Sequence, residues 1–193
     1  SEFCQAPDGS IWIGTEDAGL HRFNPEDGSF ERGFLPAGNI HALEIIDGKL
    51  WAGSYGEGIF VLSDGGKRFS RYLLSDGGGN PGANSIYSIF RDISGTVWVG
   101  TEGGLFRYNP EQDSFERVAA GLISRQVNDI LQDFVGNIWF ATMGQGLFRY
   151  TPETGIWYSP PGTDSYMTCI LEDSAHNLWF GTENSGINYY NHS

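Results

Sequence analysis

The sequence has little cysteine and little basic charge, and each shortage excludes a class of protein. Its two cysteines, Cys4 and Cys169, are too few for a disulfide scaffold and lack metal-ligand spacing. Only 11 Lys and Arg residues accompany 24 Asp and Glu residues, so the formal net charge is −13. Nucleic acid is therefore not an expected partner, because binding to a phosphate backbone needs a basic surface.

Membrane-spanning and catalytic signatures are also missing. No apolar run approaches the roughly 20 residues that cross a bilayer as a helix, and no signal segment opens the sequence, so a soluble piece is expected. Nucleophile-elbow, phosphate-loop and dinucleotide motifs are absent, and neither cysteine has a nearby histidine. We therefore predict no catalytic residues, no cofactor and no metal site. The four histidines lie on unrelated elements: His21, His41, His176 and His192.

Aromatic residues and glycine are abundant, and they occur in a repeat. A motif of an apolar residue, Trp, an apolar residue, Gly and Thr appears as IWIGT, VWVGT and LWFGT, with the weaker copies LWAGS and IWFAT. The tryptophans follow one another at intervals of 39, 47, 41 and 40 residues. They are Trp12, Trp51, Trp98, Trp139 and Trp179.

A period near forty residues that carries strand patterns and no helical ones is typical of a β-propeller blade. We predict one all-β domain over 1–193, a propeller of about five four-stranded antiparallel blades, the last lacking its outer strand. The repeats are expected at about 1–35, 36–80, 81–121, 122–161 and 162–193. We expect five blades to close into a ring. The alternative is an excerpt of a larger propeller, with an open blade edge through which the chain self-associates.

Two recurring residue types are assigned structural roles. The anchor tryptophans are expected to fill the space between adjacent blades, because they recur in every copy between aliphatic residues. Asp92, Asp133 and Asp173 occur once per copy on separate corners, so we expect each to accept backbone N–H groups within its own turn. Cys4 and Cys169 share one face of the repeat's first strand, so two unpaired, mostly buried thiols are predicted.

The copies differ most at the corner after Thr and in the loops that join one copy to the next. Varied side chains on a constant frame are how propellers build binding sites. A solvated acidic rim is an equally good interpretation of any single residue. The predicted ligand-binding residues on this loop face are Glu16, His41, Tyr55, Glu57, Tyr87, Glu102, Arg125, Asn128, Gln145, Tyr166 and Glu183.

From Asp92 to Pro110 and from Asp133 to Pro152, the sequence is similar to the two-component regulator propeller repeat, D-x-x-G-x-Φ-W-Φ-G-T-x-x-G-G-L-x-R-Y-x-P. In that family the repeats form the extracytoplasmic sensor region of membrane histidine kinases, including hybrid sensors that respond to glycan fragments. The resemblance implies a periplasmic, non-catalytic, ligand-sensing module with a small-molecule or oligosaccharide ligand. It also implies a membrane-anchored parent chain.

Two further interpretations stay open. The repeat also resembles that of streptogramin lyase, a metal-assisted propeller enzyme, which would imply His41 and Glu102 as candidate residues beside Mg²⁺. A lectin-like propeller, or an engineered or excised fragment with no ligand of its own, is the third. The residues from Ser1 to Phe3 could be a cloning remnant, although Phe3 falls in register with the first strands of later copies.

Overall fold

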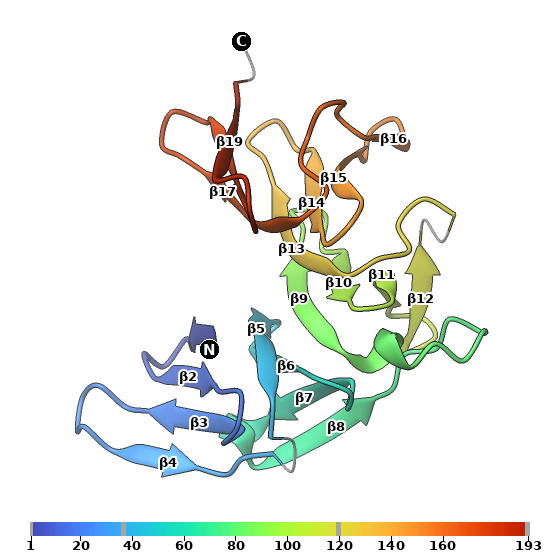
Figure 1. The fold of residues 1–193 in the computed structure, drawn as a ribbon. Coiled ribbons are helices and arrows are strands. Elements are labelled where there is room, and N and C mark those ends of the chain that lie inside the picture. The colour runs from blue at the N-terminus through green and yellow to red at the C-terminus, as the bar shows by residue number, and fades with distance from the viewer. Residues whose placement is uncertain (1, 36–37, 119–120, 192–193) are drawn as a thin grey trace.

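The fold is described from a computed structural model, over residues 2–35, 38–118 and 121–191. Its strands form five antiparallel sheets arranged side by side in an arc (Figure 1). Over these residues, helix is limited to two short 3₁₀ turns, Asp64–Gly66 and Pro81–Asn84. Within these ranges no helix has the length and apolar character needed to span a membrane. The prediction of an all-β propeller of about five blades, the last with three strands, is confirmed.

Each blade is formed by strands that are consecutive in the sequence. Blade 1 comprises β1 (Glu2–Gln5), β2 (Ile11–Gly14), β3 (Leu20–Phe23) and β4 (Phe30–Arg32). Blade 2 comprises β5 (Ile40–Ile46), β6 (Lys49–Ser54), β7 (Ile59–Ser63) and β8 (Arg68–Tyr72). Blade 3 comprises β9 (Ile86–Arg91), β10 (Val97–Thr101), β11 (Gly104–Asn109) and β12 (Ser114–Val118). Blade 4 comprises β13 (Val127–Gln132), β14 (Ile138–Thr142), β15 (Gly146–Thr151) and β16 (Ile156–Tyr158). Blade 5 comprises β17 (Met167–Glu172), β18 (Leu178–Thr182) and β19 (Ile187–Tyr190).

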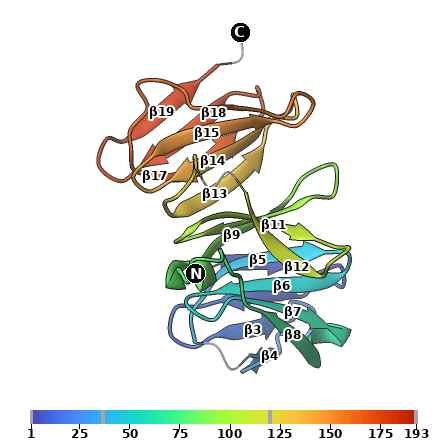
Figure 2. The same ribbon diagram turned by 90° about the vertical axis from the view of Figure 1, so that its right-hand side faces the viewer.

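The first strand of each blade is the inner strand, and the inner strands of successive blades contact one another. The order around the arc is β1, β5, β9, β13 and β17, and the outer strands β4, β8, β12 and β16 lie away from the centre (Figures 1 and 2). Any side chain at the start of an inner strand is therefore brought near its counterparts from other blades.

Local contacts require the small residues of the motif. A Cβ at Gly100 would stand 2.5 Å from the carbonyl oxygen of Val127 in the next inner strand, so the close approach of that strand requires glycine. Thr101 Oγ1 donates to the carbonyl of Gly104 at 2.9 Å and ties the corner between β10 and β11. The anchor motif thus sets both the spacing of blades and the shape of the corner that faces the candidate site.

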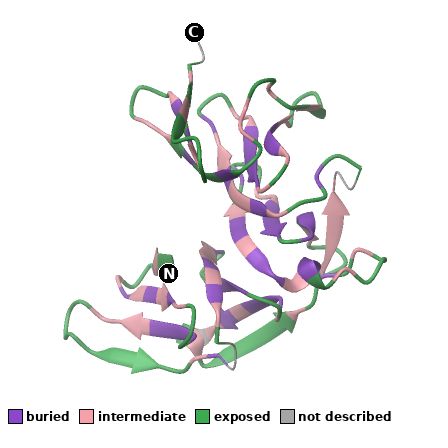
Figure 3. Ribbon diagram, in the orientation of Figure 1, coloured by how far each residue is buried: buried purple, intermediate pink, exposed green. Residues whose placement is uncertain are grey.

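Buried segments of neighbouring blades face one another and form the apolar core (Figure 3), to which Trp12, Trp51, Trp98 and Trp139 belong. Trp51 packs edge-to-face on Tyr108 of blade 3, with ring centroids 5.2 Å apart. Trp98 meets Phe140 of blade 4 at 5.6 Å, in the same relation to its following blade. Where a following blade is present, the indole therefore acts as a wedge that joins its own blade to the next.

Three of these tryptophans are also held by the turn that precedes them. Asp92 accepts hydrogen bonds from the backbone N–H groups of Ser94 and Thr96, and its Oδ2 accepts one from Trp98 Nε1 at 2.8 Å. The corresponding pairs are Asp133 with Trp139 at 2.7 Å and Asp173 with Trp179 at 2.8 Å. The carboxylate thus orients the indole as well as the turn, a role the sequence analysis did not anticipate.

The expectation of a closed ring of five blades is wrong for this chain. Trp139 is fully buried against blade 5, whereas Trp179, at the same position of the last blade, is 38% exposed. Leu147 and Ile187 are likewise equivalent, and they are 1% and 71% exposed. At the other end of the arc, Phe3 is 65% exposed. The two end faces therefore lie open, and the arc does not close on itself (Figure 1).

The open end also corrects the prediction for the cysteines. Both thiols are free, but Cys169 is exposed, because it lies on the face of blade 5 that no further blade covers. Cys4 is half-buried, and burial is the main reason that the pKa of its thiol is raised.

Trp139 and Trp179 form a matched pair for testing the wedge role. Replacing Trp139 by Ala should lower the free energy of unfolding by about 3–5 kcal/mol, because it empties a packed space between two blades. Trp179→Ala should cost clearly less, since its indole is half-exposed and has no following blade. Urea unfolding followed by circular dichroism measures both. Equal losses would contradict the wedge role.

The Asp–Trp hydrogen bond lowers the pKa of the aspartate, which can be measured. The bond from Trp179, with further donors from Asn177, lowers the pKa of Asp173 from 3.8 to about 2. Because the folded-state pKa is the lower one, this carboxylate stabilises the fold above pH 3.8, and the contribution is lost as the pH falls towards 2. In Trp179→Phe the pKa of Asp173 should move up towards its ordinary value. Carboxyl ¹³C NMR measures it, and an unchanged pKa would contradict the assignment.

Candidate ligand-binding site

The inner strands share an irregularity at one place. In blades 2 to 5 the pairing of the first strand with the second shifts by one residue near the start of the inner strand. A β-bulge of this kind leaves one residue unpaired and re-aims its side chain. The four extra residues are His41, Tyr87, Asn128 and Thr168.

These four side chains lie together on the inner side of the arc, at the start of the inner strands. This place is called the channel mouth. A hollow of about 240 Å³ lies among them, together with Glu2 and Glu16. It continues into a deeper space of about 440 Å³ that also reaches Glu44 and Asp129. The combined channel mouth is thus built from equivalent positions of successive blades.

The His41 corner of the mouth is aromatic. The His41 ring lies 5.9 Å from that of Tyr55 and 5.4 Å from that of Tyr87, the second contact being edge-to-face. Burial, with smaller effects of Glu102 and Tyr55, raises the pKa of Tyr87, so this phenol stays neutral and able to donate a hydrogen bond. An aromatic wall with polar tips suits a ligand that has both apolar and hydroxylated faces.

Asn128 is partly used by the protein itself. Its Nδ2 donates to the carbonyl of Met167 in blade 5 at 2.7 Å, and its Oδ1 accepts a bond from Gln126 at 2.6 Å. It therefore supports the junction of blades 4 and 5 at the mouth, with less capacity left for a ligand.

The deeper channel is acidic. Asp129 Oδ2 accepts a bond from the backbone N–H of Ile170 at 2.7 Å, and burial raises the pKa of its carboxyl. Burial also raises the pKa of Glu44. Neither hollow has a Lys or Arg among its described lining residues. The channel therefore disfavours anionic ligands and suits neutral ones.

Sequence analysis missed Glu2, Glu44 and Asp129. Asp129 could have been found by aligning the copies, because it occupies the position that Ser88 and Cys169 hold in neighbouring inner strands. A carboxylate at that position is specific to blade 4 and cannot belong to the repeat frame.

The predicted loop-face residues divide into two groups. Those at or beside the mouth are Glu16, His41, Tyr55, Tyr87, Glu102 and Asn128. Those that do not line it are Glu57, Arg125, Gln145, Tyr166 and Glu183. Ser1 and His192 lie outside the described residues.

Two side chains of the second group are already bonded to neighbouring residues of the protein. Glu57 forms an ion pair with Arg71 on the outer strand β8, at 3.6 Å. Gln145 accepts hydrogen bonds from the backbone of Ser124 and Arg125 and donates one to the carbonyl of Leu122. These side chains shape corners and do not meet at one site.

The part of the chain that the structure describes contains no group of three or more His, Cys, Asp or Glu side chains placed to hold a metal ion. His41 packs against two tyrosines, and Glu102 lies near enough to raise the pKa of Tyr87.

Known proteins match this chain both in sequence and in fold. The family model described as "Two component regulator propeller" matches residues 80–103, 121–144 and 161–184. Histidine kinase P4 of Formosa agariphila is 30% identical over an alignment 150 residues long, which covers 70% of this chain and 11% of that protein. The chain thus spans only a small part of the relative's length.

Two solved structures share the fold. The extracellular domain of the putative hybrid two component system BT3049 from B. thetaiotaomicron superposes with a TM-score of 0.80 at 24% identity, over 97% of this chain and 26% of that one. Virginiamycin B lyase from Staphylococcus aureus superposes with a TM-score of 0.69 at 16% identity, over 97% of this chain and 68% of that one. Repeat motif and family model agree: residues 80–103, 121–144 and 161–184 are two-component regulator propeller repeats, and the solved structures share the propeller fold.

Proposed function

We propose that the chain is part of an extracytoplasmic ligand-sensing propeller of a two-component regulator, and that it binds a small neutral ligand, such as a glycan fragment, at the channel mouth without catalysis. The observation that carries the proposal is the bulge that occurs at the same point of four inner strands. It directs His41, Tyr87 and Thr168 towards one hollow.

The relatives support the location and the partner. One is a histidine kinase, and another is described as an extracellular domain of a hybrid two component system. By analogy, we place this chain outside the cytoplasm, within a membrane-anchored parent. A sensor needs a site whose occupancy changes the contacts between blades, and Asn128, bonded across to Met167, provides such a link at the mouth.

Binding at the mouth should depend on its aromatic corner. Titration calorimetry with neutral oligosaccharides should give saturable binding to the chain. His41→Ala and Tyr87→Ala should each weaken it tenfold or more, equivalent to about 1.4 kcal/mol, because both remove contact surface in the hollow. Glu57→Gln is the matched control, since Glu57 pairs outward with Arg71 and binding should be unchanged.

Failure of every neutral oligosaccharide to bind, or equal loss in the Glu57 control, would contradict this assignment.

A second candidate, a metal-assisted lyase, is favoured by the fold shared with virginiamycin B lyase and by His41 at the mouth. If the chain were such a lyase, it would turn over a streptogramin in the presence of Mg²⁺, and His41→Ala would abolish this activity.

The two open end faces have a consequence for the isolated chain. The face of blade 5 bears Leu171, Trp179 and Ile187, all exposed, at positions that pack against a following blade elsewhere. The face of blade 1 bears Phe3, the counterpart of residues that receive such contacts. We propose that copies of the chain associate head to tail through these faces.

Sedimentation velocity tests this association. The apparent mass should rise with concentration, and Leu171→Glu combined with Ile187→Glu should restore the mass of one chain. Substitution of the exposed Ile93 by Glu, on a turn away from both faces, is the control. A single-chain mass at all concentrations would contradict head-to-tail association.

A further inference from the structure

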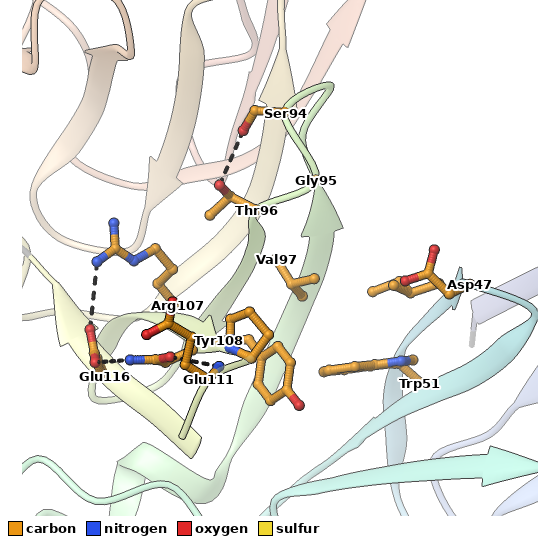
Figure 4. A pocket seen from close by; sticks show the side chains of 13 residues that line it. Asp47, Trp51, Ser94, Gly95, Thr96, Val97, Arg107, Tyr108, Glu111 and Glu116 are labelled. Carbon is orange, nitrogen blue, oxygen red and sulfur yellow. Dashed lines mark hydrogen bonds and ion pairs between the residues drawn. The ribbon is translucent and has the colours of Figure 1, made fainter. Parts of the chain in front are cut away.

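A second hollow, of about 580 Å³, lies between blades 2 and 3 at the end of the inner strands opposite to the channel mouth (Figure 4). Ile46 and Asp47, at the far end of β5, line it together with the turn at Ser94 and Gly95. Trp51 lies within it, so one of the wedge tryptophans is open to this space.

In blade 4, two groups cover the equivalent tryptophan. Asp133 accepts a hydrogen bond from Trp139 Nε1 at 2.7 Å. Arg149, directly opposite on β15, places its guanidinium 5.7 Å from the indole ring. In blade 1, Arg22 takes the same position over Trp12, at 5.5 Å. In these two blades the protein's own polar groups therefore lie over the tryptophan, although a hollow of about 350 Å³ remains between blades 1 and 2 beside Trp12 and Arg22.

Blade 2 has lost both covering groups. Its first hairpin turns through Asp47 and Gly48 alone, so no turn carboxylate reaches the indole. Val61 stands opposite Trp51, where blades 1, 3 and 4 have Arg and blade 5 has Tyr189. Trp51 is only 7% exposed and lines the hollow, and among the described residues it lacks the carboxylate acceptor that Trp98, Trp139 and Trp179 have. A buried indole N–H without such an acceptor is a donor that a bound ligand can satisfy.

The shortened turn also explains why the groove is open. In blades 3 and 4 the longer turn leans over the groove, and its second residue bonds to the next inner strand: Ile93 N–H to Gln132 at 2.8 Å, and Phe134 N–H to Glu172 at 3.2 Å. The two-residue turn of blade 2 makes only an exposed ion pair with that strand, from Asp47 to Arg91 at 2.9 Å.

The remaining lining combines apolar walls with both kinds of hydrogen-bonding group. Tyr108 and Pro110 supply flat apolar surface beside Trp51, and Arg107 supplies donors. The lining carboxylates are Asp47, Glu111 and Glu116. We propose that this hollow binds an uncharged polyhydroxylated ligand, a neutral mono- or disaccharide, whose hydroxyl groups accept from Trp51 Nε1 and donate to the carboxylates.

The charges and the size of the hollow support this ligand class. The lining holds three carboxylates and one guanidinium. Asp47 pairs with Arg91 and Glu116 with Arg107, and the remaining excess of negative charge disfavours uronates and sulfated sugars. The volume lies within the range of about 300–1,000 Å³ that small-molecule pockets occupy. The site is separate from the channel mouth, so it does not depend on the function proposed above.

The indole N–H resonance of Trp51 provides a direct test. In ¹⁵N NMR of the chain, maltose, cellobiose and methyl β-galactoside are titrated, with glucuronate as the charged comparator, and Trp51→Phe assigns the peak. At least one neutral sugar should shift the Trp51 peak saturably, while the peak of Trp139 stays in place. Glucuronate should have no comparable effect.

Two variants restore the groups that cover the tryptophan in other blades. One replaces Asp47-Gly48 by the four-residue sequence Asp-Ile-Ser-Gly of blade 3, and the other is Val61→Arg. Each should weaken the saturable shift tenfold or more, with an unchanged Trp139 peak showing that the fold is intact. His41→Ala, at the channel mouth, should leave the shift unaltered.

The proposal is overturned if none of the three sugars shifts the Trp51 peak, if glucuronate shifts it equally, or if both covered variants bind as the natural chain does. Loss of the shift in His41→Ala would also overturn it, because the response would then arise at the channel mouth. Loss of mouth binding alone, with the Trp51 response intact, would affect only the function proposed above.

Discussion

The structure depends on one contact, the wedge that each anchor tryptophan makes between its own blade and the next. A three- or four-stranded sheet of this size cannot bury its faces alone, so stability comes from the interfaces between neighbours. The Asp–Trp hydrogen bond fixes the direction of the indole in blades 3, 4 and 5. Where a following blade is present the indole is buried, and in blade 5 the same geometry leaves it half-exposed.

Both candidate sites follow from small departures from this constant frame. At one end of the inner strands, a repeated bulge turns a different side chain into the channel in each of four blades. At the other end, the loss of a turn carboxylate and of an opposing Arg leaves Trp51 uncovered. A propeller can therefore vary its binding surfaces while keeping the contacts that hold its blades together.

The sequence predicts the blades well, because the recurrence of Trp and of the Gly-Thr corner reflects contacts that every blade must make. It does not predict closure, because one blade contains no information on how many neighbours complete a ring. Of the residues predicted to bind a ligand, His41 and Tyr87 line the mouth, whereas Gln145 is hydrogen-bonded within its own loop, and ligand binding by any of them stays a prediction. The hollow at Trp51 was missed because it results from two absences on different strands, and these meet only in the folded sheet.

The most direct measurement is hydrogen exchange of the individual indole N–H groups. We predict slow exchange for Trp98 and Trp139, which are buried and bonded to carboxylates, and fast exchange for Trp51, which is also buried but has no carboxylate acceptor among the described residues. Exchange at Trp51 as slow as at Trp139 would contradict the claim that the wedge and its turn carboxylate together determine which blade interfaces are closed.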